Sequence, residues 1–202
     1  TLQKVQSKMI RINEIKLSLD DDESLLKSKA AKILKINEKY IESYTIFKKS
    51  VDARKKDDVN FTYALDVIIT LDEEQIVDKC KSGKVQIVKP YHYELPQNKR
   101  SSQFRPIGVG FGPAGMLAGL ILAQAGAMPI ILERGKDIDA RQRDVNEFWT
   151  KRKLDEESNV QFGEGGAGTF SDGKLTTGIK SPYIRKVLEV LYEAGAPEEI
   201  LY

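Results

Sequence analysis

The clearest chemical signal in the sequence is a glycine-rich hexapeptide, Gly110-Phe111-Gly112-Pro113-Ala114-Gly115. Gly110 permits a tight turn from a strand into a helix, and Gly112 lets a pyrophosphate approach the backbone because it has no Cβ atom. Gly115 allows the helix to pack closely on the strand. The free N–H groups and the dipole at the start of a helix attract phosphate. The hexapeptide therefore predicts a pyrophosphate site.

An acidic residue completes this pattern. Glu133 lies 23 residues beyond Gly110 (133 minus 110), where a carboxylate can accept hydrogen bonds from both ribose hydroxyls. The elements that must position these residues are a strand at Pro106–Val109, a helix at Pro113–Ala125 and a strand at Ala127–Leu132. This order predicts a dinucleotide-binding Rossmann unit. The alternative is a glycine-rich packing turn, with Glu133 at a solvated strand end.

A second glycine-rich segment follows at Asn159–Leu175. Its consecutive glycines can direct successive N–H groups at one anion. Thr169 and Ser171 add hydroxyl donors, and Lys174 adds positive charge. Aromatic and aliphatic residues are interleaved with the small ones, which favours an ordered loop over a flexible surface loop.

The region before these motifs predicts a small α+β domain. The expected elements are a strand at Met9–Leu17, a helix after Asp20–Asp22, strands at Tyr40–Ala53 and Asn60–Leu71, a helix at Asp72–Lys81 ended by Gly83, and a strand at Lys84–Lys89. This βαββαβ order is the ferredoxin-like plan. Because that plan hosts many functions, it indicates no activity by itself.

A polar stretch without periodicity separates the two regions. We therefore predict a ferredoxin-like domain at 1–90, a linker at 91–105 and a partial Rossmann domain at 106–202. The chain opens at Thr1 and closes at Tyr202, directly after a helical pattern. We expect it to be the N-terminal part of a longer protein.

Composition narrows the classes of protein. The hydrophobic fraction of 41% and the mean hydropathy of -0.39 fit a globular rather than a disordered chain. A net charge of +2 implies no general affinity for polyanions. The single cysteine, Cys80, cannot form an internal disulfide, so a reducing cytoplasm is the expected compartment. No signal peptide is expected, and we assign no metal site.

Two further interpretations compete with nucleotide binding. Basic residues at Lys48, Lys49 and Arg54–Lys56 suggest a hairpin that contacts nucleic acid, but acidic residues interrupt the run, which favours a solvated hairpin. Ile107–Leu132 is uncharged and long enough to cross a membrane. Glycines and prolines interrupt it repeatedly, so we expect no membrane span.

Three segments together resemble a bacterial family of FAD-dependent dehydrogenases, whose members are mostly described as uncharacterised NAD(P)/FAD-dependent oxidoreductases. They are the hexapeptide, Leu132-Glu133-Arg134-Gly135, and the run from Gly163 to Leu175. The stretch Lys49–Lys56 is also similar to that family's leading domain. The resemblance implies a glutathione-reductase-type flavoprotein fold. It further implies a longer chain that carries a substrate-facing domain and a later Gly-Asp segment.

The resemblance also implies where FAD would bind. Gly110–Gly115, including Phe111, would line the pyrophosphate, and Glu133 would hold the adenosine ribose. Arg134 and Arg141 would lie near the adenine or the phosphates. The ribityl and isoalloxazine portion would be approached by Gly165, Gly166, Ala167, Gly168, Ser171, Asp172 and Lys174.

These observations favour the N-terminal part of an FAD-dependent oxidoreductase that acts on an unknown small molecule, incomplete as an enzyme over this length. NAD(P) is expected as a second nucleotide of the longer protein. The alternative is an NAD(P)-binding domain, in which Arg134 meets a 2′-phosphate. No catalytic acid or base is assigned, since His92 lies in the linker and Cys80 has no partner for a dithiol relay.

Overall fold

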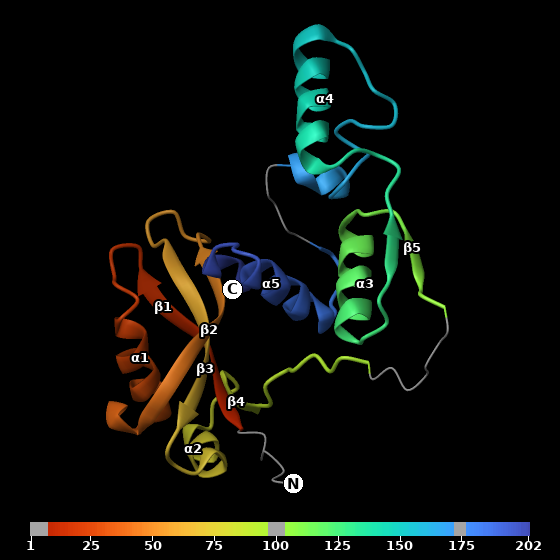
Figure 1. The fold of residues 1–202 in the computed structure, drawn as a ribbon. Coiled ribbons are helices and arrows are strands. Elements are labelled where there is room, and N and C mark those ends of the chain that lie inside the picture. Colours follow the sequence, from red (N-terminus) through yellow and green to blue (C-terminus); the bar gives the residue numbers. More distant parts are fainter. Residues whose placement is uncertain (1–7, 97–103, 172–176) are drawn as a thin grey trace. The chain divides into compact units, whose positions relative to one another are not determined.

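The computed structural model describes residues 8–96, 104–171 and 177–202. It shows a mixed α/β protein with a four-stranded antiparallel sheet and a separate two-stranded parallel sheet. The chain forms two compact units (Figure 1). The first comprises Thr1–His92 and Pro182–Tyr202, and the second comprises Tyr93–Ser181.

The four strands of the first unit confirm the strands expected from sequence alternation. They are β1 (Met9–Ser18), β2 (Ile41–Asp52), β3 (Asn60–Ile69) and β4 (Val85–Val88). Their order in the sheet is β2-β3-β1-β4, and each pair of neighbours is antiparallel.

An irregularity in β1 explains how its apolar residues share one face. Ile12 pairs with Leu65 of β3, and Ile15 pairs with Tyr63. Between these two pairs, β1 therefore contains one more residue than β3. Glu14 lies in this bulge with φ of 58°. A bulge shifts the alternation by one position. Ile12 and Ile15 are therefore both buried, although simple alternation would place them on opposite faces.

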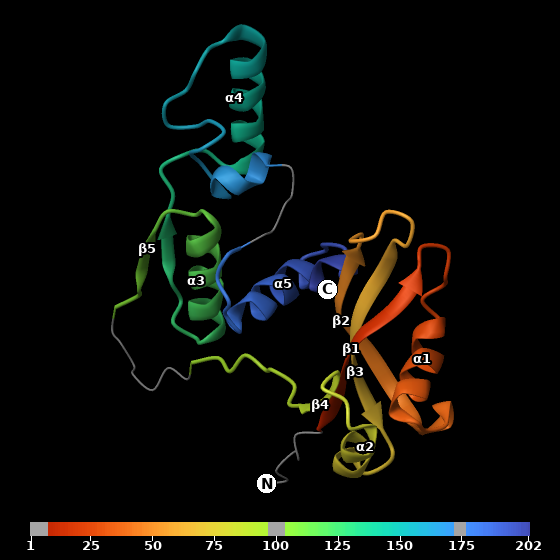
Figure 2. The same cartoon turned by 180° about the vertical axis from the view of Figure 1, so that it is seen from behind.

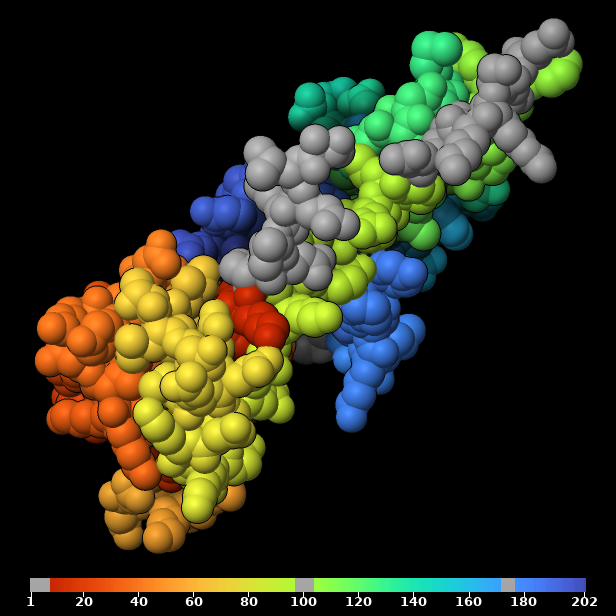
Figure 3. Space-filling model, turned by 90° about the horizontal axis from the view of Figure 1, so that it is seen from below, coloured from red at the N-terminus to blue at the C-terminus, as the bar shows by residue number. Residues whose placement is uncertain are grey.

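Two helices, α1 (Leu25–Leu34) and α2 (Glu73–Cys80), complete the core of the first unit. The short helix η1 (Glu38–Tyr40), which has no buried residue, leads into β2. Leu26, Ala30 and Leu34 of α1 join the sheet residues in one buried cluster. α1 lies beside the four-stranded sheet (Figures 1 and 2). α1 and α2 also contact each other, and their side chains form one continuous surface in orange and yellow (Figure 3).

The end of α2 corrects one expectation. Asp72 caps its start by accepting a hydrogen bond from the Gln75 N–H at 2.8 Å. The C-cap is Lys81, with a left-handed φ of 47°, and not Gly83. The predicted helix, Asp72–Lys81, agrees with α2 to within one residue at each end, but the role given to Gly83 is wrong. Lysine has a Cβ atom and reaches the left-handed conformation at some cost, so the sequence favoured the nearby glycine for this role.

The C-terminal segment contains α5 (Tyr183–Glu193) and η3 (Glu198–Leu201). Arg185 Nη1 donates to the Leu201 carbonyl at 2.7 Å and links the two helices. Residues 182–202 group with the first unit, whereas the sequence placed them at the end of a 106–202 domain. The three expected domain ranges stay a prediction.

The second unit begins with β5 (Ile107–Val109), α3 (Pro113–Gln124) and β6 (Ile130–Leu132). The strands pair in parallel, with Gly108 opposite Ile131. On the face towards α3, Gly108 and Gly119 leave room for the Ile131 side chain. β6 starts three residues later than expected, directly after Pro129, because proline lacks the N–H that a strand pair uses.

The remaining elements of the second unit are α4 (Ile138–Lys151) and the short helix η2 (Gly166–Phe170). η2 lies next to the N-terminal end of α3 (Figures 1 and 2). Among the described residues, no helix combines the length and apolar character that crossing a membrane requires.

Candidate functional site

The Gly110–Gly115 turn joins β5 to α3, as the sequence predicts. Gly110 has φ of 94°, a left-handed conformation that glycine adopts without strain. Its N–H donates to the Leu132 carbonyl of β6 at 2.7 Å, so the turn starts as a continuation of the strand pair. Gly112 is the N-cap of α3, and the exposed Pro113 and Ala114 form the first helical turn.

Gly115 has no room for a side chain. A Cβ atom at this position would collide with the carbonyl oxygen of Gly110. A Cβ atom on Gly112 would meet only the Gly166 Cα at 3.8 Å, an ordinary contact. Gly115 therefore brings the helix close to the strand, while Gly112 keeps space beside the N-terminal N–H groups of α3. The close packing at Gly115 matches the role predicted from spacing, whereas the approach of a pyrophosphate at Gly112 stays a prediction.

Glu133 lies at the end of β6 and is anchored to the turn. Its Oε2 accepts from the Phe111 N–H at 2.6 Å, and its Oε1 accepts from the Gly135 N–H at 2.8 Å. These backbone donors, Gly135 first and then Phe111, lower the pKa of the carboxyl group, and the charge of Arg141 adds a smaller effect. Each carboxylate oxygen has a second lone pair that can accept from a ribose hydroxyl.

The second glycine-rich loop packs directly on the turn. The Gly165 N–H donates to the Phe111 carbonyl at 2.9 Å. A Cβ atom on Gly166 would lie 3.1 Å from the Gly112 Cα and 3.2 Å from the Pro113 Cδ. The structure thus brings together two segments that sequence reasoning linked only through the family resemblance.

Two backbone N–H groups of this loop donate to carbonyl groups of the protein, whereas we expected the loop to direct its N–H groups at an anion. The Gly165 N–H is taken by Phe111, and the Gly166 N–H donates to the Gly163 carbonyl at 3.0 Å. Ala167 and Gly168 lie in η2 and are exposed, and Ser171 follows it. Asp172 and Lys174, the last predicted binding residues, lie outside the described residues. The loop therefore braces the turn through Gly165 and Gly166.

Arg141 is fully buried in α4 and faces the loop. Nε donates to the Asn159 carbonyl at 2.8 Å, and Nη2 to the Val160 carbonyl at 2.9 Å. Nη1 donates to the Glu164 carbonyl at 2.6 Å, and the guanidinium carbon lies 4.8 Å from the centre of the Phe170 ring. Burial lowers the pKa of Arg141. In this arrangement its guanidinium is engaged by the loop and has no exposed surface for a ligand.

Arg134 points to a different neighbour. Its Nε lies 2.7 Å from a carboxylate oxygen of Glu157, and its guanidinium lies 5.2 Å from the centre of the Phe162 ring. The side chain is exposed, and this ion pair already balances its charge. This geometry does not support a role for Arg134 in binding a 2′-phosphate.

Sequence reasoning missed three residues of this site. Gly135 and Gly163 lie so close that a Cβ atom on Gly135 would overlap the Gly163 backbone. Glu164 accepts from the Ile138 N–H at 2.7 Å and, with Asp137, caps the start of α4. The glycines were visible in the sequence, but nothing local indicated that 135 and 163 approach each other.

Two of the basic residues of the hairpin in the first unit are paired with acidic side chains. Lys49 Nζ lies 2.6 Å from Glu23, and Arg54 makes two hydrogen bonds of 2.8 Å to Asp52. The choice between a solvated hairpin and a nucleic-acid site stays a prediction. Cys80 is half-buried, and burial raises the pKa of its thiol, so it lacks the character of a reactive thiolate.

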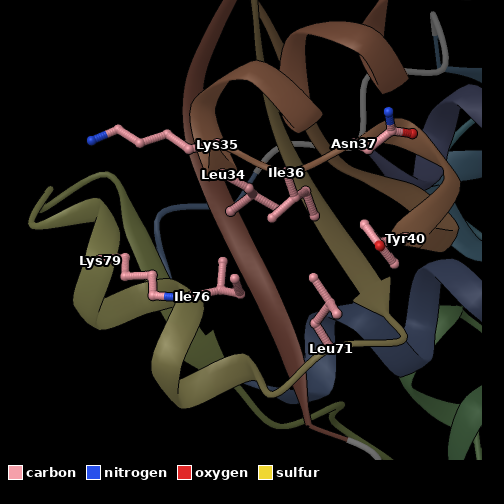
Figure 4. A pocket seen from close by; sticks show the side chains of 8 residues that line it. All are labelled: Leu34, Lys35, Ile36, Asn37, Tyr40, Leu71, Ile76 and Lys79. Carbon is pink, nitrogen blue, oxygen red and sulfur yellow. The ribbon is translucent and has the colours of Figure 1, made fainter.

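A separate cavity of about 580 Å³ lies in the first unit, between the end of α1, η1 and α2. Its apolar lining comes from Leu34, Ile36, Leu71 and Ile76, and the Lys35 side chain extends away from it (Figure 4). The other lining residues are Asn37, Tyr40 and Lys79. None of the residues predicted from sequence to bind a cofactor lines this cavity.

Comparison with known proteins gives two matches. Residues 9–68, from β1 to near the end of β3, match a family described as a domain of unknown function, DUF8436. The chain is also 44% identical over 194 residues to an "Uncharacterized protein" of Clostridium beijerinckii. That alignment covers 96% of this chain but 36% of the relative, so the chain spans about a third of the relative's length.

These matches correct the family resemblance drawn from the sequence. The family and the relative both lack a described function, and neither points to a flavoprotein dehydrogenase, so that assignment is wrong. The assignment rested on short glycine-rich runs, which tight turns and close backbone contacts require in many unrelated proteins. Cofactor contacts derived from the resemblance alone, such as those of Arg134 and Arg141, lose that support.

Proposed function

We propose that the second unit binds the ADP portion of a dinucleotide through the Gly110–Gly115 turn and Glu133. The observation that supports this most strongly is the pair of hydrogen bonds that fixes Glu133 beside the turn. A pyrophosphate would lie against Gly112 and the exposed start of α3, where helix N–H groups attract anions. The adenosine ribose would then meet the remaining lone pairs of Glu133. We infer from this arrangement the nucleotide-binding half of a Rossmann fold.

We propose FAD as the dinucleotide and an FAD-dependent oxidoreductase as the whole protein. The second loop packs on the turn and confines the space beside it, which suits a cofactor that stays bound through the reaction. When bound, a flavin supplies hydride or electron transfer, and the protein positions it. The substrate, the electron acceptor and the catalytic residues are not assigned.

NAD is the second candidate, because Glu133 suits any adenosine ribose with a free 2′-hydroxyl. NADP is disfavoured as the ligand of this turn, since a carboxylate repels a 2′-phosphate and Arg134 is paired with Glu157. A separate NAD(P) site in a longer protein stays a prediction, as does a cytoplasmic location.

For the first unit we infer the ferredoxin-like plan. The order β2-β3-β1-β4, the antiparallel neighbours and the two helices that join one core cluster support it. This plan assigns no activity, so the first unit adds nothing to the choice of cofactor.

The test is to purify the full-length protein and compare its binding of FAD, NAD and NADP by calorimetry, with a visible spectrum of the protein as isolated. We expect a bound flavin, or stoichiometric reconstitution with FAD, and much weaker binding of NADP. A colourless protein that takes up NAD and not FAD would select the second candidate. A protein that binds none of the three would refute the proposal.

A further inference from the structure

Arg141 stands out among the buried groups of the second unit because it carries a charge. Its side chain is completely buried, yet its hydrogen-bond partners are backbone carbonyls and the Thr169 hydroxyl. A buried charge is tolerated only when its polar atoms are well satisfied. The guanidinium fork presents donors in several directions, which an ammonium group cannot reproduce in one plane.

The acceptors of this guanidinium lie in the second loop. Asn159 and Val160 are at its start, and Glu164 lies immediately before the glycines that touch the turn. Gly163 also packs on the aliphatic stem of Arg141, since a Cβ atom there would lie 2.6 Å from the Arg141 Cδ. One side chain therefore fixes three points of the loop backbone.

The loop passes this constraint on to the turn. Gly165 follows Glu164 directly, and its N–H donates to the Phe111 carbonyl. Phe111 is the residue whose own N–H donates to Glu133. A continuous path of hydrogen bonds and adjacent residues thus runs from Arg141 through Glu164, Gly165 and Phe111 to Glu133.

We propose that Arg141 is a positioning residue, which holds the Asn159–Phe170 loop against the Gly110–Gly115 turn and thereby sets the affinity of the nucleotide site without touching the nucleotide. This proposal rests on the proposed function for its effect on affinity. The position of the loop itself depends only on the contacts of Arg141. The two parts can therefore fail separately.

The test compares Arg141→Met and Arg141→Lys with the wild type and with Arg143→Met, a change at an exposed arginine on the same helix. Two quantities are measured in the full-length protein: ADP affinity by calorimetry, and hydrogen exchange of the Gly165 amide. Hydrogen exchange of the backbone amides of α4, measured in the same samples, reports whether this helix remains folded.

For Arg141→Met we expect faster exchange at Gly165 and ADP binding weaker by roughly tenfold to a hundredfold, because buried carbonyls lose their donors. Arg141→Lys keeps the charge and the aliphatic stem but not the planar fork of donors. It should therefore show the same changes at a smaller size, with normal hydrogen exchange of the α4 amides. Arg143→Met should match the wild type in both measurements. If Arg141→Met unfolds α4, the lysine variant decides the outcome.

Three results would overturn the proposal or its basis in distinguishable ways. Unchanged exchange at Gly165 in both Arg141 variants would show that Arg141 does not hold the loop. Faster exchange with unchanged ADP affinity would show that the loop does not set the affinity. A wild type that fails to bind ADP would refute the proposed function, while the exchange measurement would still decide whether Arg141 holds the loop.

Discussion

The first unit and the second unit use different interactions to fix their backbones. In the first unit, residues from β1, β3, α1 and their neighbours form one apolar cluster, in which Ile10, Leu26 and Leu65 are completely buried. In the described part of the second unit, Val145 is the only large hydrophobic side chain that is buried. The other buried residues of that part are polar or small: Arg141, Ser158, and the closely packed glycines Gly119 and Gly163.

The parallel sheet of the second unit shows the same contrast. Its side chains on the face away from α3 are exposed, with Val109 at 86% and Ile107 at 65%. Parallel sheets are usually covered on both faces. The difference teaches that apolar burial holds the first unit, whereas the Gly110–Gly115 turn depends on glycines without side chains and on buried polar contacts.

The largest effect is expected from removing apolar volume in the first unit. Leu65→Ala should lower the free energy of unfolding by about 2 to 5 kcal/mol, because it removes buried methyl groups and leaves a cavity. Denaturant unfolding followed by circular dichroism measures this change. Leu19→Ala, at an exposed leucine, should change stability by less than about 0.5 kcal/mol. Equal effects of the two substitutions would refute the role given to the core.

The second unit should instead be sensitive to the addition of a methyl group. Gly115→Ala should destabilise the turn by about 1 to 3 kcal/mol, because the new Cβ atom collides with the Gly110 carbonyl. Hydrogen exchange of the Phe111 and Gly135 amides would report the loss of the turn. Gly168→Ala is the matched control, since a Cβ atom at that position would have open space around it. A turn that accepts alanine at 115 would contradict the close packing of α3.

A smaller effect is expected from the charge of Glu133. Its pKa is lowered in the folded protein, so its contribution to stability is fully present above 4.5, its ordinary value, and is lost as the pH falls through the lowered pKa. The contribution should be about 1 kcal/mol or less, because the carboxylate is partly exposed to solvent. The amide signals of Phe111 and Gly135 should titrate below pH 4.5, and in Glu133→Gln they should not. If these amide signals titrate at the ordinary pKa of 4.5, the hydrogen bonds from Phe111 and Gly135 to Glu133 are absent.

The smallest effect is expected from the basic hairpin of the first unit. Lys49→Ala removes an ion pair with Glu23 at a partly exposed site, so stability should fall by about 0.5 kcal/mol. Thermal unfolding measures the change, and Lys48→Ala on the same strand serves as a comparison. A loss as large as that of Leu65→Ala would remove the contrast between the two kinds of interaction.

Much of the first unit could be predicted because its strands and helices are periodic. The strand predicted at Met9–Leu17 contains Ile10 and Ile12, which are both buried in the core, and the helix predicted at Asp72–Lys81 matches α2. The bulge at Glu14 could not be predicted, because no residue type marks the position where one strand gains a residue. The left-handed Lys81 was missed for a similar reason, since the nearby Gly83 is the more favourable residue for a helix end.

The candidate site could be predicted only as far as its interactions are local. The turn and Glu133 belong to one strand-turn-helix-strand segment, and their spacing follows from that geometry. The contacts of Arg141 reach backbone carbonyls 18 to 23 residues away. A carbonyl is present at every residue, so the sequence carries no sign of which ones a buried guanidinium will meet. Asp172 and Lys174 lie outside the described residues, and their predicted roles stay predictions.

The most direct test of the account is hydrogen exchange of the full-length protein with and without ADP, resolved at individual amides. We predict that ADP protects the amides of Gly112, Ala114 and Gly115. Gly115→Ala should abolish this protection while the exchange of the first unit's core stays unchanged. Binding of ADP with protection elsewhere in the molecule, or no binding at all, would contradict the assignment of the turn as the nucleotide site.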